Sequence, residues 1–440
     1  TSEEQERLGV SNRDYLLELY DRGTVKQTLI DLGFPVEDKA PLKDGDPLEF
    51  TYAEQALAAG FGVREYQKAA VEGFVGDGRP GTGFGTVVMP CGSGKTIVGI
   101  EAMRKLARST LILTTNVSAV HQWIRELRNR TSIPDDDIGE YTGTTKQIRP
   151  VTVATYQVLT WRKSKEESFP HFELFRAHNW GLIIYDEVHL LPAPVFRVTA
   201  EIQAIRRLGL TATLVREDGL ERYVFGLVGP KRFDVPWKEL ESRGWIATAE
   251  CIEIRVPMSE HLQREYAVAG KREQFALASR NHEKVDIVST LVHKHADEGI
   301  LVIGQYLDQL RELAKSLDAP LISGSMPHVK RDELYQAFRD GQTRVLVVSK
   351  VANFAIDLPD ASVGIQVSGT FGSRQEEAQR LGRILRPKDG PARFYTLVSQ
   401  YSSEEEYAAN RQQFLIEQGY QYRIDYWEHD EATHDDTSAE

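Results

Sequence analysis

The chain has 440 residues, a formal net charge of −12, 41% hydrophobic residues and 27% charged residues. This composition excludes fibrous and low-complexity chains and predicts a globular protein of two or three domains, with no apolar run near the roughly 20 residues of a membrane span. The only two cysteines, Cys91 and Cys251, exclude a disulfide framework and suit a reducing compartment. The negative charge leaves nucleic acid open as a ligand, because binding needs only a local basic groove.

The first segment, 1–55, is predicted to be the end of an upstream module followed by a linker. Short helices are expected at 15–20 and 25–30. Pro35, Pro41 and Pro47 then fall among other turn residues, which is typical of a linker.

Residues 85–96 read Gly-Thr-Val-Val-Met-Pro-Cys-Gly-Ser-Gly-Lys-Thr and predict a buried strand, a sharp turn and the start of a helix. Backbone N–H groups of the turn, together with the helix dipole, would cradle phosphate. The residues of this candidate cofactor site are Cys91, Gly92, Ser93, Gly94, Lys95 and Thr96. Lys95 would reach the terminal phosphates of ATP and act catalytically, and the Thr96 hydroxyl would bind Mg²⁺. The alternative is an ordinary glycine-rich turn.

The segment 56–240 alternates apolar strand candidates with amphipathic or polar stretches. This alternation predicts an α/β domain with a parallel sheet covered by helices on both faces. The candidates lie at 110–115, 151–155, 181–185 and 208–211. A second round at 283–425 has candidates at 300–304, 320–323, 345–349, 363–367 and 394–398, so two similar halves would share one nucleotide.

Two further segments complete the predicted organisation. Residues 241–282 are expected to be a connector with a small helical insertion, either an arm touching nucleic acid or a solvated linker helix. The last segment, 426–440, has several carboxylates and no Lys or Arg, which predicts an acidic disordered tail.

Residues 181–189 form an apolar run that ends in Asp186, Glu187 and, two residues later, His189. A nucleotide hydrolase needs one carboxylate for Mg²⁺ and another to orient and deprotonate the attacking water. We assign Asp186 to the metal and Glu187 to the water. His189 is expected to link this loop to the second domain.

A helix is predicted at 375–386, where Gln379, Arg383 and Arg386 are spaced to share one face. Two arginines on one face are suited to grip the γ-phosphate as arginine fingers, so all three are candidate catalytic residues. The alternative is an exposed basic helix face.

Together these motifs resemble superfamily 2 helicases, and most closely the XPB (xeroderma pigmentosum group B) family of DNA translocases, including its prokaryotic members. The resemblance covers about 60–425 and rests on the segments 90–96, 186–189, 208–218, 357–359, 375–387 and 414–420. It implies two RecA-like domains in tandem that share an ATP cleft, with ATP and Mg²⁺ as cofactors. The expected partner is single-stranded, forked or duplex DNA, in nucleotide-excision repair or transcription-linked opening.

Further residue roles follow from this resemblance alone. Arg64 and Gln67 match the adenine-side glutamine motif, and Asp357 is a further cofactor-binding candidate. Candidate DNA contacts are Asn116, Thr155, Tyr156, Arg216, Glu217 and Asp218. Prokaryotic relatives are expected in the cytoplasm, sometimes with a nuclease partner, and eukaryotic ones in the nucleus. Residues 352–355, Ala-Asn-Phe-Ala, depart from the family pattern, which puts the coupling of DNA contact to nucleotide state in doubt.

The sequence therefore predicts an ATP-dependent 3′-to-5′ DNA helicase or translocase, with the polarity taken from the resemblance. One alternative is a duplex translocase or ATP-driven switch that positions a nuclease without processive unwinding. Another is a nucleotide-dependent scaffold that does not hydrolyse ATP. A strand-displacement assay beside a DNA-stimulated ATPase assay separates these alternatives.

Overall fold

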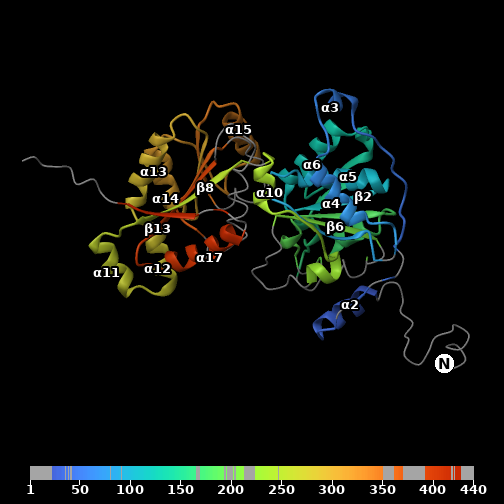
Figure 1. Ribbon diagram of the computed structural model, residues 1–440, viewed down its shortest axis with the longest axis horizontal. Coiled ribbons are helices and arrows are strands. Elements are labelled where there is room, and N and C mark those ends of the chain that lie inside the picture. The colour runs from blue at the N-terminus through green and yellow to red at the C-terminus, as the bar shows by residue number, and fades with distance from the viewer. Residues whose placement is uncertain are drawn as a thin grey trace, which may run out of the picture. The chain divides into compact units, whose positions relative to one another are not determined.

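A computed structural model describes most of the chain. The residues outside its description are 1–21, 35, 38, 40–41, 80, 91, 165–168, 193–194, 196–201, 203–204, 213–222, 246, 350–360, 370–391, 418–419, 421 and 428–440. The chain divides into two compact units, Thr1–Val235 and Pro236–Glu440, and each contains one parallel sheet (Figure 1).

The first unit is built on a seven-stranded sheet of order β3-β4-β2-β5-β6-β1-β7, in which neighbouring strands are all parallel. Its strands are β1 (Phe84–Val88), β2 (Thr110–Thr114), β3 (Ile138–Tyr141), β4 (Val151–Thr155), β5 (Leu182–Asp186), β6 (Arg206–Thr211) and β7 (Lys231–Asp234). Its α-helices are α2 (Arg22–Asp31), α3 (Glu54–Ala58), α4 (Glu65–Val75), α5 (Lys95–Leu106), α6 (Val117–Arg130) and α7 (Tyr156–Leu159). Short 3₁₀ or π turns are η2 (Asp135–Asp137), η3 (Pro170–Phe175), η4 (Val188–Leu190) and η5 (Val224–Val228).

Both faces of this sheet are covered, which explains why its central strands are continuous apolar runs. Ile183 and Tyr185 lie in a buried cluster with residues of α7, η3 and η5. Ile184 points to the other face, where α5 approaches so closely that a Cβ on Gly99 would lie 3.4 Å from Ile184 Cδ1. Each such side chain contributes about 1.5–3 kcal/mol on burial.

Residues 43–53, which we call the strap, cross the amino-terminal ends of the strands of the first sheet. Backbone hydrogen bonds join Asp46 to residues 109 and 179, and Leu48 to residue 107. The Asp44 carboxylate pairs with Arg108 at 2.6 Å and with Arg206 at 3.2 Å. The sequence predicted a linker here; in the structure this part of it is instead fixed to the domain by hydrogen bonds and ion pairs.

The second unit repeats the plan with the strand order β10-β11-β9-β12-β13-β8-β14, again all parallel. Its strands are β8 (Ala249–Val256), β9 (Ile300–Gly304), β10 (Leu321–Ile322), β11 (Val345–Ser349), β12 (Val363–Gln366), β13 (Ala392–Ser399) and β14 (Tyr422–Tyr426). Its helices are α10 (Trp237–Ser242), α11 (Glu260–Val268), α12 (Lys271–Ser279), α13 (Glu283–Lys294), α14 (Leu307–Ser316), α15 (His328–Arg339) and α17 (Ser403–Glu417). Helices α13 and α14 share an apolar cluster with β8, β9 and β13, while α17 contacts β13 and β14.

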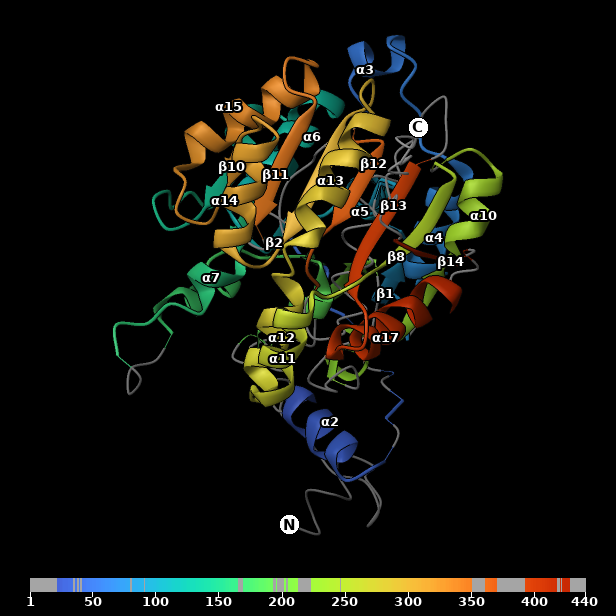
Figure 2. The same ribbon diagram turned by 90° about the vertical axis from the view of Figure 1, so that its left-hand side faces the viewer.

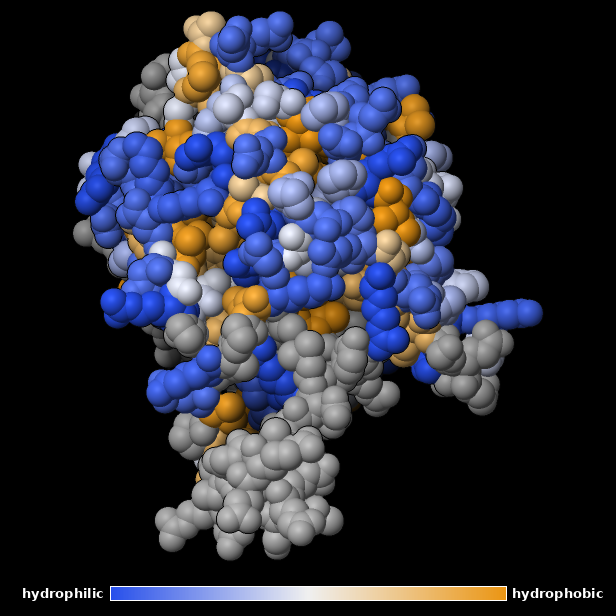
Figure 3. Space-filling view, turned by 90° about the vertical axis from the view of Figure 1, so that its right-hand side faces the viewer, coloured by the Kyte–Doolittle hydropathy of each residue, from blue (hydrophilic) through white to orange (hydrophobic). Residues whose placement is uncertain are grey.

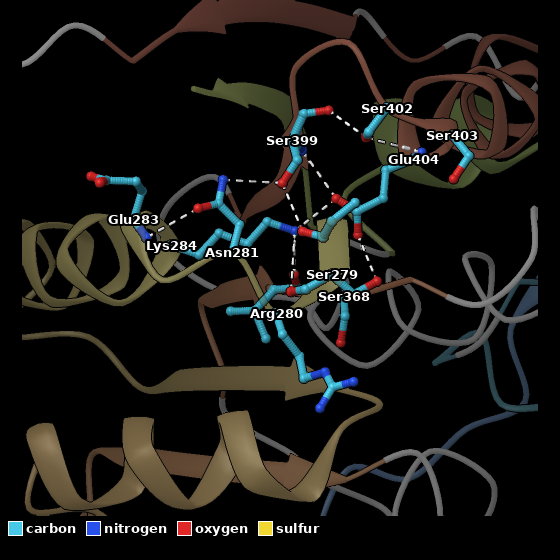
Figure 4. A network of polar contacts seen from close by, with 12 residues as sticks. Ser279, Arg280, Asn281, Glu283, Lys284, Ser368, Ser399, Ser402, Ser403 and Glu404 are labelled. Carbon is cyan, nitrogen blue, oxygen red and sulfur yellow. Dashed lines mark hydrogen bonds and ion pairs between the residues drawn. The ribbon is translucent and has the colours of Figure 1, made fainter. Parts of the chain in front are cut away.

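A buried polar network lies where several strands of the second sheet end (Figure 4). The Lys284 side chain is 0% exposed, and its Nζ donates to Glu404 Oε2 at 2.8 Å and to the Val367 carbonyl at 3.0 Å. Glu404 also accepts from Ser279 Oγ and from the Ser399 amide. The network therefore joins the start of α13 to the start of α17 and to two strand ends.

The predicted fold class, two parallel-sheet α/β domains in tandem, is confirmed, and most predicted strands match within one or two residues. The predicted connector 241–282 contains α11 and α12, but it also contains β8, which lies inside the second sheet between β13 and β14. The predicted domain boundaries otherwise remain a prediction, and the tail 428–440 lies outside the described residues.

The face of the first unit seen in Figure 3 is mostly hydrophilic, with apolar residues scattered over it. None of the helices in the described ranges combines the length and apolarity required to cross a bilayer.

Candidate nucleotide site

The predicted nucleotide residues meet because three parallel strands end side by side. Register pairs Val88 at the end of β1 with Thr211 of β6, and Asp186 at the end of β5 with Leu210 of β6. The glycine-rich loop and the acidic pair therefore leave the sheet at the same carboxyl-terminal edge, where ligands bind in open α/β sheets.

The loop after β1 has the backbone geometry that its glycines predict. Gly92 and Gly94 have φ values of 77° and 82°, in the left-handed region that favours glycine. Ser93 is buried, and its hydroxyl donates to the Pro90 carbonyl at 2.6 Å. Helix α5 then begins at Lys95, so its unbonded N–H groups and positive dipole end face the loop. This part of the chain fits a phosphate group; Cys91 lies outside the described residues.

Lys95 faces the acidic end of β5. Its side chain is only 10% exposed, and its Nζ lies 3.8 Å from Glu187 Oε1 and 3.4 Å from the Met89 and Pro90 carbonyls. Glu187 has a φ of 49°, a left-handed conformation that costs a non-glycine residue about 1–2 kcal/mol. The strained residue turns the chain directly after β5 and keeps its carboxylate beside the lysine.

Asp186 is held in a fixed orientation by groups from other elements. Trp123 of α6 donates its Nε1–H to Asp186 Oδ2 at 2.8 Å, and the Glu187 amide donates to Oδ1 at 3.1 Å. Burial, reinforced by the neighbouring Glu187 carboxylate, raises the pKa of Asp186 to about 6, against the opposing effects of Trp123 and Lys95. A carboxylate that is removed from water in this way is suited to bind a cation.

The site fits Mg²⁺ in the way that nucleotide enzymes use it. Mg²⁺ is usually bound by one or two carboxylates together with substrate phosphates, without a cage made only of protein ligands. Within the described ranges, no three His, Cys, Asp or Glu side chains are grouped so that they could hold a metal ion. Asp186 carries a carboxylate and Thr96 a hydroxyl of the kind that this mode requires, and their binding of Mg²⁺ stays a prediction.

His189 connects two strand ends inside the first unit. Its Nδ1 lies 2.7 Å from Thr211 Oγ1 and 3.4 Å from Glu187 Oε2, and the residue is 2% exposed. The sequence predicted a link to the second domain. The printed contacts place His189 between the acidic pair and the end of β6, and the link to the second domain stays a prediction.

Arg64 and Gln67 lie against the glycine-rich loop. Gln67 accepts from the Arg64 amide at 2.9 Å and donates Nε2–H to the Ser93 carbonyl at 2.9 Å. The Tyr66 hydroxyl donates to the same carbonyl at 2.8 Å and accepts from Arg64 Nη1 at 3.1 Å. A Cβ on Gly94 would lie 2.5 Å from Gln67 Nε2 and would push this amide from its position, and the positive φ of Gly94 favours glycine there.

The candidate DNA contacts near the strand ends have structural roles. The Asn116 side chain accepts from the Ala119 amide and caps α6, and Thr155 Oγ1 accepts from the Val158 amide and caps α7. Thr155 and Tyr156 are 3% and 2% exposed, and the Tyr156 hydroxyl donates to the Asp186 carbonyl at 3.0 Å. DNA contact by Asn116, Thr155 and Tyr156 stays a prediction.

The remaining predicted residues fall outside the described part of the chain, so their roles stay predictions. They are Arg216, Glu217, Asp218, Asp357, Gln379, Arg383 and Arg386, together with the departure at 352–355.

Sequence reasoning missed Trp123 and Tyr66 as parts of the site. Trp123 is 1% exposed and reads as a core residue of an amphipathic helix. Nothing local predicts that its indole N–H meets a carboxylate 63 residues later in the chain. Tyr66 lies inside the glutamine motif, and that proximity was the one available signal.

Comparisons with known proteins show which family this chain belongs to. Residues 60–216 match the family model described as the res subunit of type III restriction enzymes, and residues 240–438 match that of the ERCC3/RAD25/XPB C-terminal helicase. The DNA 3′-5′ helicase XPB of Kineococcus radiotolerans is 55% identical over 406 residues, which cover 92% of this chain and 71% of that protein. The chain belongs to the XPB family.

Other matches agree with the placement in the XPB family. The XPB helicase/translocase subunit of general transcription and DNA repair factor IIH from Encephalitozoon cuniculi is 35% identical, over 93% of this chain and 62% of that protein. Among solved structures, S. cerevisiae Dbp5 bound to RNA and ADP BeF3 matches with a TM-score of 0.61 at 13% identity, covering 84% of this chain and 92% of that one. This structural likeness shows the fold, tandem RecA-like domains.

Proposed function

We propose that this XPB-family chain is an ATP-driven 3′-to-5′ DNA helicase that acts in DNA repair or transcription-linked DNA opening. The observation that carries the proposal is the convergence of Lys95, Asp186 and Glu187 at one sheet edge, with Lys95 Nζ 3.8 Å from Glu187 Oε1. Membership of a family whose bacterial and eukaryotic relatives are named as helicases gives the substrate, DNA, and the polarity.

Each residue of the site has one part in the proposed hydrolysis. Backbone groups of Gly92, Ser93 and Gly94 bind the phosphates, and Lys95 leaves Glu187 to neutralise the terminal phosphate. Asp186 and Thr96 would hold Mg²⁺, and the ion would supply positive charge beside the phosphate oxygens. Glu187, released from the lysine, orients the attacking water and accepts its proton.

The proposal extends to residues and partners beyond the described site. Arg383 and Arg386, with Gln379, would complete the charge stabilisation as arginine fingers, and Asp357 would bind the nucleotide. A nuclease partner and a cytoplasmic location, or a nuclear one in a eukaryote, belong to the same proposal. Their support is the resemblance in sequence.

The substitution Lys95→Ala tests the assignment of Lys95 to the terminal phosphate of ATP. Loss of the phosphate-binding charge is expected to reduce ATP turnover by about 100-fold or more, while circular dichroism and the melting temperature stay unchanged. Lys105→Ala is the matched control, because Lys105 lies on the same helix and forms a 3.7 Å surface pair with Glu72. Normal turnover by Lys95→Ala would contradict the assignment.

Two assays on the unaltered protein distinguish DNA unwinding from translocation without unwinding. ATPase rates are measured without DNA and with single-stranded, duplex and forked DNA, beside displacement of a labelled strand from a fork. We expect stimulation together with displacement that starts only from a 3′ tail. DNA-stimulated hydrolysis without displacement would instead favour the duplex translocase or switch.

A further inference from the structure

The carboxyl-terminal edge of the first sheet continues beyond the nucleotide site. From β5 the sheet runs to β2, β4 and β3, so the segments that follow these strands lie along the same edge. Helix α7 follows β4, and Gln157 in α7 donates a hydrogen bond to the Thr115 carbonyl at the end of β2. Figure 2 shows α7 and the green segment after it reaching outward from the strands.

Three rings at this edge form what we call the aromatic column: Tyr141, His171 and Trp161. Tyr141, at the end of β3, is 9% exposed, and its hydroxyl lies 2.9 Å from His171 Nδ1. The Tyr141 and His171 rings are 5.7 Å apart in an edge-to-face arrangement, and the His171 and Trp161 rings are 5.9 Å apart. The column thus extends from the core to Trp161 at the surface.

Trp161 leaves much of its indole in water, with 55% of the residue exposed. A single exposed apolar residue is ordinary on a protein surface. This one differs because it is supported by a ring that is itself hydrogen-bonded to a buried tyrosine. A supported ring loses little conformational entropy when a flat ligand stacks on it.

The surroundings of the column are basic. Lys146 Nζ lies 4.6 Å from the centre of the Tyr141 ring, and the Arg162 guanidinium lies 4.9 Å from that of Phe169. Lys163 is exposed next to Arg162. Among described residues, neither Lys146 nor Lys163 forms an ion pair with a carboxylate, and the nearby Glu140 Oε2 lies 3.3 Å from His121 Nε2. Exposed aromatic rings among cations are the recurring feature of sites for single-stranded nucleic acid, where rings stack on bases and cations contact phosphates.

We propose that Trp161, supported by His171 and Tyr141, stacks on an unpaired base of single-stranded DNA, with Lys146, Arg162 and Lys163 facing its phosphates. This inference rests on the proposed function, because it assumes that DNA passes along the carboxyl-terminal edge. It adds a base-stacking contact at the β3–β4 end of that edge. Duplex DNA, whose bases are covered by their neighbours, would not use it.

The test is the affinity of Trp161→Ala for fluorescent DNA, measured by anisotropy with three ligands: oligothymidylate, an abasic strand of equal length, and a blunt duplex. Removal of one stacking ring should weaken oligothymidylate binding about 5- to 150-fold, the equivalent of 1–3 kcal/mol per base. Binding of the abasic strand and the duplex should not change, because neither offers a base face. Trp161→Phe keeps a ring and should restore most of the affinity.

Two controls keep this inference separate from the proposed function. Tyr426→Ala removes an aromatic residue of similar exposure, 68%, from the second unit and should bind all three ligands like the unaltered protein. Basal ATP hydrolysis without DNA should be the same for every variant. If Trp161→Ala binds oligothymidylate normally, or loses affinity equally for the abasic strand, base stacking is refuted while the helicase assignment stands. If the unaltered protein neither binds DNA nor is stimulated by it, the proposed function fails, and the stacking site with it.

Discussion

The hydrogen bond from Trp123 to Asp186 offers a sharp test of how the site is organised. Trp123→Phe removes one N–H donor from a buried carboxylate. It also removes the edge of the indole that faces α5, where a Cβ on Gly99 would lie 2.5 Å from Trp123 Cη2. A hydrogen bond to a charged group contributes about 1.5–3 kcal/mol. If that energy serves to position Asp186 for the metal, kcat/KM for ATP should fall about 10- to 150-fold, at 1.36 kcal/mol for each factor of ten.

The assay is steady-state DNA-stimulated ATP hydrolysis at several Mg²⁺ concentrations, with Trp180→Phe as the matched control. Trp180 is also fully buried in the first unit, and its Nε1–H donates to the Leu174 carbonyl at 2.9 Å, away from the nucleotide edge. Both variants should lose stability, but only Trp123→Phe should lose catalysis. Near-normal hydrolysis by Trp123→Phe, or an equal loss in Trp180→Phe, would refute the reasoning.

The same substitution predicts a change in pH dependence. Burial raises the pKa of Asp186 to about 6, and the Trp123 hydrogen bond acts in the opposite direction. Without the donor the pKa rises further, so as pH falls Asp186 is protonated earlier and loses its affinity for a cation. The acid limb of the pH–rate profile should therefore move to higher pH in Trp123→Phe, and an unmoved or lowered limb would contradict this assignment.

Two predictions concern stability and are measured by urea denaturation. A Cβ on Gly181 would lie 2.4 Å from the Asp44 carbonyl in the strap, so Gly181→Ala should cost about 1–3 kcal/mol, whereas Gly143→Ala, with open space around it, should cost little. Lys284→Met leaves the Glu404 carboxylate buried without its cation and should cost about 3–5 kcal/mol, most of which Lys284→Met combined with Glu404→Leu should recover. If Gly181→Ala unfolds with the same free energy as the unaltered protein, the packing against the strap is misjudged. If the double variant is less stable than Lys284→Met alone, the cost assigned to the buried carboxylate is misjudged.

Elements whose signal is local were predictable from the sequence. The run before Asp186 is uniformly apolar because β5 is covered on both faces, and the glycines before Lys95 are required by left-handed backbone angles. By contrast, β8 was predicted to be part of a connector, and its apolar pattern is interrupted by Glu253. That carboxylate is 0% exposed and accepts hydrogen bonds from Gln412 and from the Tyr422 hydroxyl, partners that appear only after folding.

In the candidate site, too, contacts that form only on folding could not be predicted from the sequence. Lys95, Asp186 and Glu187 belong to short motifs whose chemistry can be read in place. The contacts of Trp123 and Tyr156 with Asp186 depend on how α6 and α7 pack beside the end of β5, which no short motif encodes. Tyr156 was therefore predicted at a DNA surface although its ring is buried.

The strap determines how the first unit would respond to mechanical force. A handle for optical tweezers attached at Leu42, after α2 and directly before the strap, would pull on the hydrogen bonds of Asp46 and Leu48, at the end of the strands opposite to Lys95. Load would detach these contacts before it reached the glycine-rich loop. A tethered molecule should therefore keep hydrolysing ATP while its strap is peeled away.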